Sequence, residues 1–291
     1  MVHRPIGVFD SGIGGMTVVK ELFATTPKES IVYFGDTARV PYGSKSVETV
    51  RRYAREDTEL LLGYDVKMIV VACNTVSATA LEEVERMAHG IPVIGMIGPC
   101  AAEAVRVTTS GKIGIIGTEA TIASQAYEAA IEEESKRAGK MCVTFSAACP
   151  LFVPLAEEGW TDHVASELIA EEYLQSVRMK NVDTLILGCT HYPVLGGVIQ
   201  RTMGAGVQLV NSGFAAARLV AEILQREHEG EEGVESASSR SPLSSGRGVA
   251  AHTVLVSDVP RKFQAIGERF LGRPLPEAQR VVWKESWTVE R

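Results

Sequence analysis

The strongest constraint on the fold is the alternation of short apolar runs with amphipathic stretches along most of the 291 residues. Short, continuously apolar runs are typical of strands buried on both faces, and a period near 3.6 residues is typical of surface helices. Strands that alternate with helices form mostly parallel sheets, so the sequence predicts an α/β fold. The expected strands are 6–10, 30–34, 68–72, 92–97, 112–117, 144–146, 184–188, 208–210 and 252–257. The expected helices are one ending at residue 22 and others over 46–62, 77–87, 121–138, 164–177, 213–226 and 259–271.

The two halves of the chain share a similar order of strands and polar segments. The strand that ends at Asp10 has a counterpart that ends before Thr118, and the strand before Cys73 has a counterpart before Cys189. The separations are similar, 63 residues from Asp10 to Cys73 and 71 from Thr118 to Cys189. A weak internal duplication is therefore expected, with two similar lobes whose strand ends face a common cleft, where open α/β sheets bind ligands. Lobe one is expected to comprise 1–98 plus 212–291, and lobe two 99–211.

Composition limits the possible functions. Hydrophobic residues make up 45% and charged residues 22% of the chain, and the net charge is −7. An acidic chain disfavours a nucleic-acid-binding surface. No apolar run approaches the roughly 18 residues that a membrane span needs, and no signal-peptide core precedes the first strand, so we expect a cytoplasmic protein. The stretch 227–248 is rich in Glu, Ser and Gly and is expected to be a flexible insertion.

Two cysteines carry the main chemical signal. The five cysteines form no CxxC pair, which in a reducing compartment favours free thiols. Cys73 and Cys189 each end an apolar strand and precede small polar residues, whereas a cysteine needed only for packing requires no polar neighbours. Two opposed thiols suit racemisation, because one removes the α-proton and the other delivers a proton to the opposite face. The histidines show no metal-ligand spacing with the cysteines, so no metal is expected.

Other segments supply weaker signals. Asp10 and Ser11 begin a glycine-rich turn before a helix, which brings backbone N–H groups close to an anion; Asp10 either binds a substrate ammonium, orients a thiol or caps the helix. The loop 36–43 follows a strand and is a candidate ligand contact. His191 lies two residues after Cys189, and Glu157 is a candidate to orient it, unless this Glu simply faces solvent.

Taken together, these segments resemble the glutamate racemase family. The resemblance rests on GVFDSGIGG, YFGDTARVPYG, VVACNTVSA, CPLFVPLAEEG and LGCTHYP, which occur in that order. It implies two α/β lobes assembled as a homodimer and interconversion of L- and D-glutamate without pyridoxal phosphate or another cofactor, supplying D-glutamate for peptidoglycan. It also implies catalytic roles for Cys73, Cys189, Asp10, Glu157 and His191, and leaves open whether Glu157 or Glu158 assists. The implied substrate contacts are Asp10, Ser11, Tyr42, Gly43, Asn74, Thr75, Thr190 and His191.

Three alternatives remain at this point. A related racemase or decarboxylase would act on aspartate, a hydantoin or a malonate, although two thiols favour racemisation over one-sided protonation. A thiol hydrolase would use Cys189 with His191 and would not need Cys73. A non-catalytic binding module would hold a small anion in the cleft.

Overall fold

The computed structural model describes residues 4–235, 250–259, 262–284 and 286–289. Its strands are β1 (Ile6–Asp10), β2 (Ile31–Gly35), β3 (Met68–Val71), β4 (Val93–Ile94), β5 (Lys112–Gly117), β6 (Val143–Ala148), β7 (Thr184–Gly188), β8 (Gln208–Asn211), β9 (His252–Val256), β10 (Ala278–Lys284) and β11 (Ser286–Val289). Its α-helices are α1 (Met16–Thr25), α2 (Val47–Leu62), α3 (Asn74–Thr79), α4 (Leu81–Met87), α5 (Ile97–Val107), α6 (Glu119–Ala123), α7 (Ala126–Ala138), α8 (Phe152–Glu158), α9 (Val164–Arg178), α10 (Gly196–Met203), α11 (Ser212–Glu235) and α12 (Phe263–Leu271). Two short 3-10 helices are η1 (Tyr42–Ser44) and η2 (Tyr192–Leu195).

The strands form two sheets with the same core topology. One sheet contains the order β2-β1-β3-β4, and the other is β6-β5-β7-β8. Every pairing within these two cores is parallel. Because the first strand of each set lies between the second and the third, β1 corresponds to β5 and β3 to β7. The α/β prediction is confirmed, and the repeated order agrees with the expected internal duplication.

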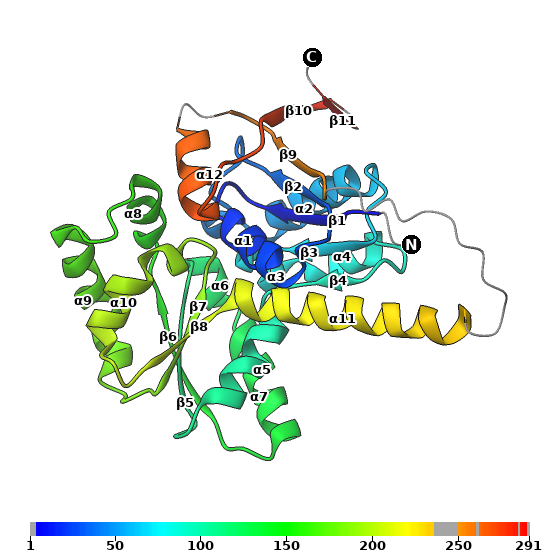
Figure 1. Cartoon of the computed structure of the whole chain (residues 1–291). Helices are drawn as coiled ribbons and strands as arrows, with labels where there is room; N and C mark the ends of the chain where they lie inside the picture. The colour runs from blue at the N-terminus through cyan, green and yellow to red at the C-terminus, as the bar shows by residue number, and fades with distance from the viewer. Residues whose placement is uncertain (1–3, 236–249, 260–261, 285, 290–291) are drawn as a thin grey trace.

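Lobe one extends its sheet beyond the shared core. β9 pairs with β2, and β10 pairs with β9, both in parallel. β11 then turns back and pairs antiparallel with β10, and neither strand of this C-terminal hairpin was predicted from the sequence. Helix α12 connects β9 to β10, and Figure 1 shows it next to α8 of the second lobe. This placement brings the C-terminal part of the chain close to lobe two.

Several expected elements differ in extent. The expected helix 77–87 is two helices that meet at Ala80, whose φ of −145° is not helical. The expected helix 121–138 begins at residue 119 and divides at Gln125, which has a left-handed φ of 54°. The expected strand 92–97 shrinks to β4, because α5 begins at Ile97; Pro99 in its first turn removes no intrahelical hydrogen bond.

The expected insertion 227–248 needs correction. Helix α11 does not end at residue 226 but continues to Glu235, so residues 227–235 are helical. Glutamate is a good helix former, and Gln225 Nε2 donates to Glu229 Oε1 four residues later at 2.9 Å. Residues 236–248 of the predicted insertion lie outside the described residues.

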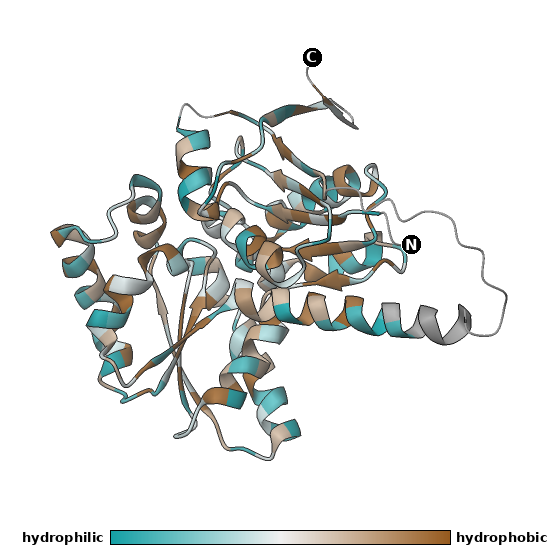
Figure 2. Cartoon of the chain, in the orientation of Figure 1, coloured by the Kyte–Doolittle hydropathy of each residue, from teal (hydrophilic) through white to brown (hydrophobic). Residues whose placement is uncertain are grey.

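The two lobes are packed together rather than joined only by linkers. One hydrophobic cluster includes Val8 of lobe one as well as Leu185 and Leu187 of lobe two. The start of α11 contacts both lobes, since Thr25 of α1 donates to the carbonyl of Ala217, and Arg218 pairs with Glu103 of α5. Figure 2 shows apolar residues concentrated in the strands and polar residues on the outer helices. The expected boundaries at residues 98 and 211 fall at the start of α5 and the end of β8, and the division into domains stays a prediction.

Candidate active site

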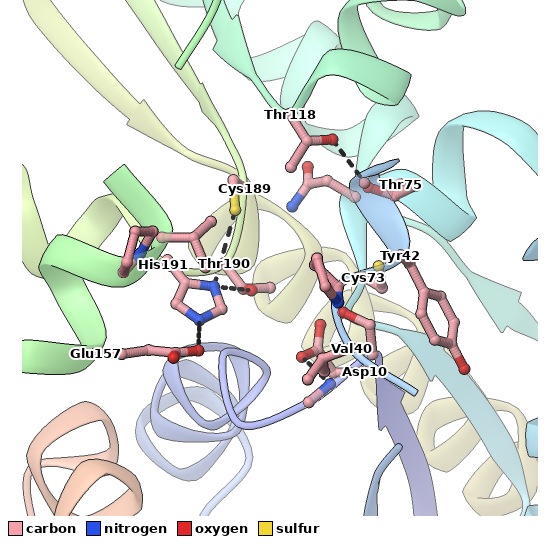
Figure 3. A pocket seen from close by; sticks show the side chains of 17 residues that line it. Asp10, Val40, Tyr42, Cys73, Thr75, Thr118, Glu157, Cys189, Thr190 and His191 are labelled. Carbon is pink, nitrogen blue, oxygen red and sulfur yellow. Dashed lines mark hydrogen bonds and ion pairs between the residues drawn. The ribbon is translucent and has the colours of Figure 1, made fainter. Parts of the chain in front are cut away.

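A cavity of about 250 Å³ lies between the lobes, at the carboxyl ends of their central strands. The ends of β1 and β3 contribute from lobe one, and the end of β7 contributes from lobe two. Figure 3 shows Cys73 on one side of the cavity and Cys189 on the other. The lining contains all eleven residues proposed from the sequence, which are Asp10, Ser11, Tyr42, Gly43, Cys73, Asn74, Thr75, Glu157, Cys189, Thr190 and His191.

On the lobe-two side, Cys189 belongs to a chain of hydrogen-bonding groups. Its Sγ lies 3.9 Å from His191 Nδ1, and His191 Nε2 lies 3.0 Å from Glu157 Oε1. Burial alone lowers the pKa of His191, but its contacts with Cys189 and Glu157 outweigh that effect and raise the pKa to about 10. His191 is therefore a cation at neutral pH and donates from both ring nitrogens. A cationic imidazole beside a sulfur atom is a common way to generate a reactive thiolate.

The structure distinguishes the two neighbouring glutamates. Glu157 faces His191, whereas Glu158 is exposed and pairs with Lys262 Nζ at 2.8 Å. Both lie in the last turn of α8, where consecutive side chains point in directions about 100° apart. The geometry therefore assigns the contact with His191 to Glu157.

On the lobe-one side, Cys73 is buried and precedes the first residue of α3. Burial raises the pKa of the Cys73 thiol to about 12, and the nearby Asp10 adds to the shift. The Val76 backbone N–H and the Ser11 hydroxyl oppose the shift by hydrogen bonding to the sulfur. With its pKa raised, Cys73 is a protonated thiol at neutral pH, suited to donate a proton.

Asp10 ends β1 and lies on the Cys73 side of the cavity. Its Oδ2 accepts from the Gly12 backbone N–H at 3.0 Å, while Oδ1 is buried and has no hydrogen-bond partner among the described residues. Burial raises the pKa of Asp10, although the charge of His191 and the nearby backbone N–H groups of Gly12, Gly15 and Ser11 oppose the shift. A buried carboxylate oxygen without a partner is costly unless a ligand satisfies it. Asp10 is therefore placed to accept a hydrogen bond from a bound ammonium group.

Tyr33, which was not predicted as a site residue from the sequence, supports the turn after Asp10. Its hydroxyl donates to the Gly12 carbonyl at 2.6 Å, and its side chain is buried. A Cβ on Gly15 would lie 2.9 Å from the Tyr33 ring, so the turn packs directly on the tyrosine. Tyr33 lies inside an apolar strand, where a buried tyrosine usually serves packing. Its hydroxyl, which needs a hydrogen-bond partner when buried, was the one sequence signal that could have identified it.

Tyr42 lines the cavity, but its hydroxyl points away from it. Figure 3 shows the ring directed out of the site. The hydroxyl contacts Asp36 and Asp57, and Arg39 forms ion pairs with both of these carboxylates. Burial and the neighbouring Asp36 raise the pKa of Asp57 well above its usual range. The loop 36–43 is thus held by a buried polar network, and any contact that Tyr42 makes with a ligand comes from its backbone or ring.

Hydroxyl groups join the two lobes along the cavity wall. Thr75 Oγ1 lies 3.0 Å from Thr118 Oγ1 of lobe two, and Thr17 Oγ1 of lobe one donates to the Thr190 carbonyl at 2.8 Å. Asn74 Oδ1 accepts from the Tyr127 hydroxyl at 2.6 Å. The sequence singled out Asn74, Thr75 and Thr190, but not the residues that hold them.

The residues that line the cavity limit the chemistry it can perform. None of the seventeen described residues that line it is Lys or Arg, so His191 supplies the positive charge. In the described part of the chain, no group of three or more His, Cys, Asp or Glu side chains is arranged to hold a metal ion. Two thiols facing one cavity from equivalent strand ends are suited to move a proton between the two faces of a small molecule. This fold and site define the class of two-base racemases.

Comparison with known proteins gives the family. The chain belongs to the Asp/Glu/hydantoin racemase family, whose model matches residues 6–220. It is 50% identical to the glutamate racemase of Chlorobaculum tepidum over 277 residues, 95% of this chain and 96% of that one. It is 49% identical to the glutamate racemase of Geobacter metallireducens over 281 residues, 97% of each chain. The crystal structure of glutamate racemase from Francisella tularensis in complex with D-glutamate superposes with a TM-score of 0.85 and 36% identity, covering 97% of this chain and 98% of that one.

Proposed function

We propose that this protein interconverts L- and D-glutamate by proton transfer between two thiols and the α-carbon, without pyridoxal phosphate. The observation that carries the proposal is the placement of Cys73 and Cys189 on opposite sides of one cavity, each with its own polar support. Full-length relatives at about 50% identity that are glutamate racemases support the choice of substrate. Membership of a racemase family sets aside the thiol hydrolase and the binding module.

The proton steps follow from the two thiols. A thiolate on one side removes the α-proton and becomes a thiol, and the electron pair of the broken C–H bond remains on the α-carbon. The opposing thiol donates its proton to the other face, forms the new C–H bond with that electron pair and becomes a thiolate. The enantiomer leaves, and the two sulfurs have exchanged protonation states. The reverse reaction uses the same groups in exchanged roles.

The site offers specific partners for an amino acid. Asp10 Oδ1 is placed to accept from the substrate ammonium, which would also offset the effect of the buried carboxylate on Cys73. With no Lys or Arg in the lining, the substrate carboxylates would be held by neutral donors, for which the Ser11, Thr75 and Thr190 hydroxyls and the backbone at Tyr42 and Gly43 are available. The amide of Asn74 adds a further donor. Neutral donors suit carboxylates that must also leave with the product.

His191 and Glu157 would assist Cys189, and Asp10 would assist Cys73. The Cys189, His191 and Glu157 chain resembles the nucleophile, base and orienting group of thiol hydrolases. What distinguishes the present site is a second thiol, Cys73, across the cavity. The alternative substrates aspartate, hydantoin and malonate remain the competitors to test.

The decisive experiment follows purified protein with L-glutamate in D₂O, without pyridoxal phosphate. Optical rotation and α-deuterium are measured for wild type, Cys73→Ala and Cys189→Ala. We expect wild type to lose optical rotation while incorporating deuterium, and each variant to lose racemisation by at least about 100-fold, because acid–base groups typically contribute 10²–10⁴ in rate. No exchange by folded wild type would refute the glutamate assignment and direct the assay to aspartate, hydantoins and malonates. Cys149→Ala, which removes a buried thiol outside the lining, is the matched control.

The cellular setting is also part of the proposal. We place the reaction in the cytoplasm, where it would supply D-glutamate for peptidoglycan, and we expect a homodimer. No helix in the described ranges is both long and apolar enough to cross a membrane.

A further inference from the structure

Helix α12 of lobe one contacts the Cys189 side of the site, which belongs to lobe two. Arg269 Nη1 donates to the carbonyl oxygen of Glu157 at 2.9 Å. The ring of the next residue, Phe270, meets the His191 ring edge-on, with centroids 5.4 Å apart and an interplanar angle of 89°. Two adjacent residues from the end of the chain therefore touch both groups that support Cys189.

Arg269 covers the end of a short helix. Helix α8 has seven residues, and Glu157 lies in its last turn, where carbonyl groups lack partners within the helix. The chain then turns at Gly159 with φ of 72°, and a Cβ at this position would lie 2.5 Å from Arg269 Nη1. A cation at a helix C-terminus is favourable, and its hydrogen bond satisfies one of those carbonyls. Arg269 therefore fixes the turn that carries Glu157.

This support is needed because Glu157 is not held by burial. Its side chain is 39% exposed, so its position relative to His191 depends on the backbone of the last turn of α8. Phe270 is buried and limits rotation of the His191 ring from the other side. Arg269 acts on the carboxylate and Phe270 on the imidazole.

Among the described residues, the side-chain hydrogen bond of Arg269 reaches the Cys189 side alone. The supporting groups of the Cys73 side, Asp10, Ser11 and Tyr33, belong to lobe one itself. A change at Arg269, whose hydrogen bond reaches α8, should therefore affect Cys189 more than Cys73, even though α12 also packs against α1.

We propose that Arg269 and Phe270 are positioning residues that align Glu157 and His191, so that proton transfer at Cys189 depends on the contact between the lobes. The inference rests on the proposed two-thiol racemisation and deepens it. When the contact is lost, Cys189 becomes a poorer base for one enantiomer and a poorer acid for the other.

The test measures deuterium isotope effects in both directions. Arg269→Met keeps the aliphatic stem and removes the donor and the charge, and because Arg269 is exposed the variant should fold. Arg273→Met is the matched control, since Arg273 is also exposed and its guanidinium stacks on Phe23 within lobe one. Each protein is assayed with α-protonated and α-deuterated L- and D-glutamate, and its melting temperature is recorded.

We expect Arg269→Met to lower kcat/KM about 10-fold, since small misplacements of acid–base groups reduce rates by up to about 100-fold. For the enantiomer whose proton Cys189 removes, removal becomes more rate-limiting and the isotope effect on kcat/KM rises. For the other enantiomer, Cys73 removes the α-proton and Cys189 delivers the new one. Slow proton delivery then makes removal less rate-limiting, so the isotope effect on kcat/KM falls.

Opposite movements in Arg269→Met with unchanged values in Arg273→Met would establish the positioning role. Isotope effects in Arg269→Met that stay at wild-type values, move in the same direction for both enantiomers, or are matched by Arg273→Met would overturn it. Failure of the proposed function is distinguishable, because wild type itself would then racemise neither enantiomer.

Discussion

The two thiols occupy equivalent places in the two lobes, yet different residues surround them. Asp10 ends β1 of lobe one, where lobe two has Thr118 directly after β5. Conversely, His191 lies two residues after Cys189, where lobe one has Thr75 after Cys73. The same fold therefore places the charged group that supports each cysteine differently. In lobe one this group is Asp10 at the end of the first strand, and in lobe two it is His191 after the cysteine.

This difference changes how each side is held. On the Cys73 side, the turn that carries Asp10 rests on Tyr33 of its own lobe, although Asn74 and Thr75 also contact lobe two. The Cys189 side uses a half-exposed carboxylate and depends on contacts from lobe one. A duplicated fold can thus supply two similar acid–base thiols while the residues that support them diverge.

The largest expected effect on kcat/KM comes from a substitution that separates the Cys73 and Cys189 sides of the cavity. A Cβ on Gly14 would overlap Thr190 Oγ1 and lie 2.5 Å from His191 Cε1. We therefore expect Gly14→Ala to lower kcat/KM by about 100-fold or more, because it displaces the histidine from Cys189. Steady-state racemisation of both enantiomers measures the loss. Gly98→Ala is the control, since no atom lies within 4 Å of its Cβ position, and near-wild-type activity in Gly14→Ala would show that the contact between the sides is unimportant.

A smaller effect is expected from removing the carboxylate on the Cys189 side. Glu157→Gln keeps the shape but removes the charge that helps to raise the pKa of His191, so the imidazolium form is favoured less. We expect kcat/KM to fall by about 10-fold, a fraction of the 10²–10⁴ typical of a direct acid–base group. Glu158→Gln is the matched control, because Glu158 pairs with Lys262 at the surface. Equal losses in the two variants would remove the distinction between these glutamates.

The corresponding change on the Cys73 side should be milder. Tyr33→Phe removes the hydrogen bond to the Gly12 carbonyl and leaves a buried acceptor without its donor, which costs about 1–3 kcal/mol of stability. The backbone turn around Asp10 is otherwise fixed by packing, so we expect kcat/KM to fall only about threefold, roughly 0.7 kcal/mol in the barrier. Thermal unfolding and racemisation assays measure the two effects. A loss of activity larger than that of Glu157→Gln would reverse the comparison between the sides.

The sequence predicted most of the strands and eleven of the seventeen residues that line the cavity. Apolar strands such as β1 and β7 are recognisable because they are buried on both faces, and each leads to a polar segment at the sheet edge. The helix breaks at Ala80 and Gln125 were missed, since both depend on backbone conformations that no local turn residue announces. The charged end of α11 was wrongly predicted to be part of a flexible insertion, because a polar composition also suits an exposed helix.

The supporting residues could not be found in the same way. Arg269 and Phe270 lie more than 75 residues from Cys189 in the sequence, and an arginine followed by a phenylalanine is ordinary for a surface helix. Tyr33 likewise fits the apolar pattern of its strand. Their roles arise from packing between segments that are far apart in the chain, which local patterns do not encode.

The smallest expected effect is on stability and concerns the charge of His191. Its pKa is raised from an ordinary value of 6.5 to about 10 in the folded protein by Cys189 and Glu157, against the effect of burial. A raised pKa means that the folded state binds the proton more tightly, so the stabilisation is fully present below pH 6.5 and is lost as the pH rises through about 10. The melting temperature of wild type should therefore exceed that of His191→Gln at pH 6, and the difference should shrink towards pH 10.5. Because a pKa change of this size corresponds to a few kcal/mol, we expect that difference to change by several degrees. A difference that stays constant or widens with pH would show that His191 is not held as a cation, and the Cys189 side would then lack the positive charge that sets it apart from the Cys73 side.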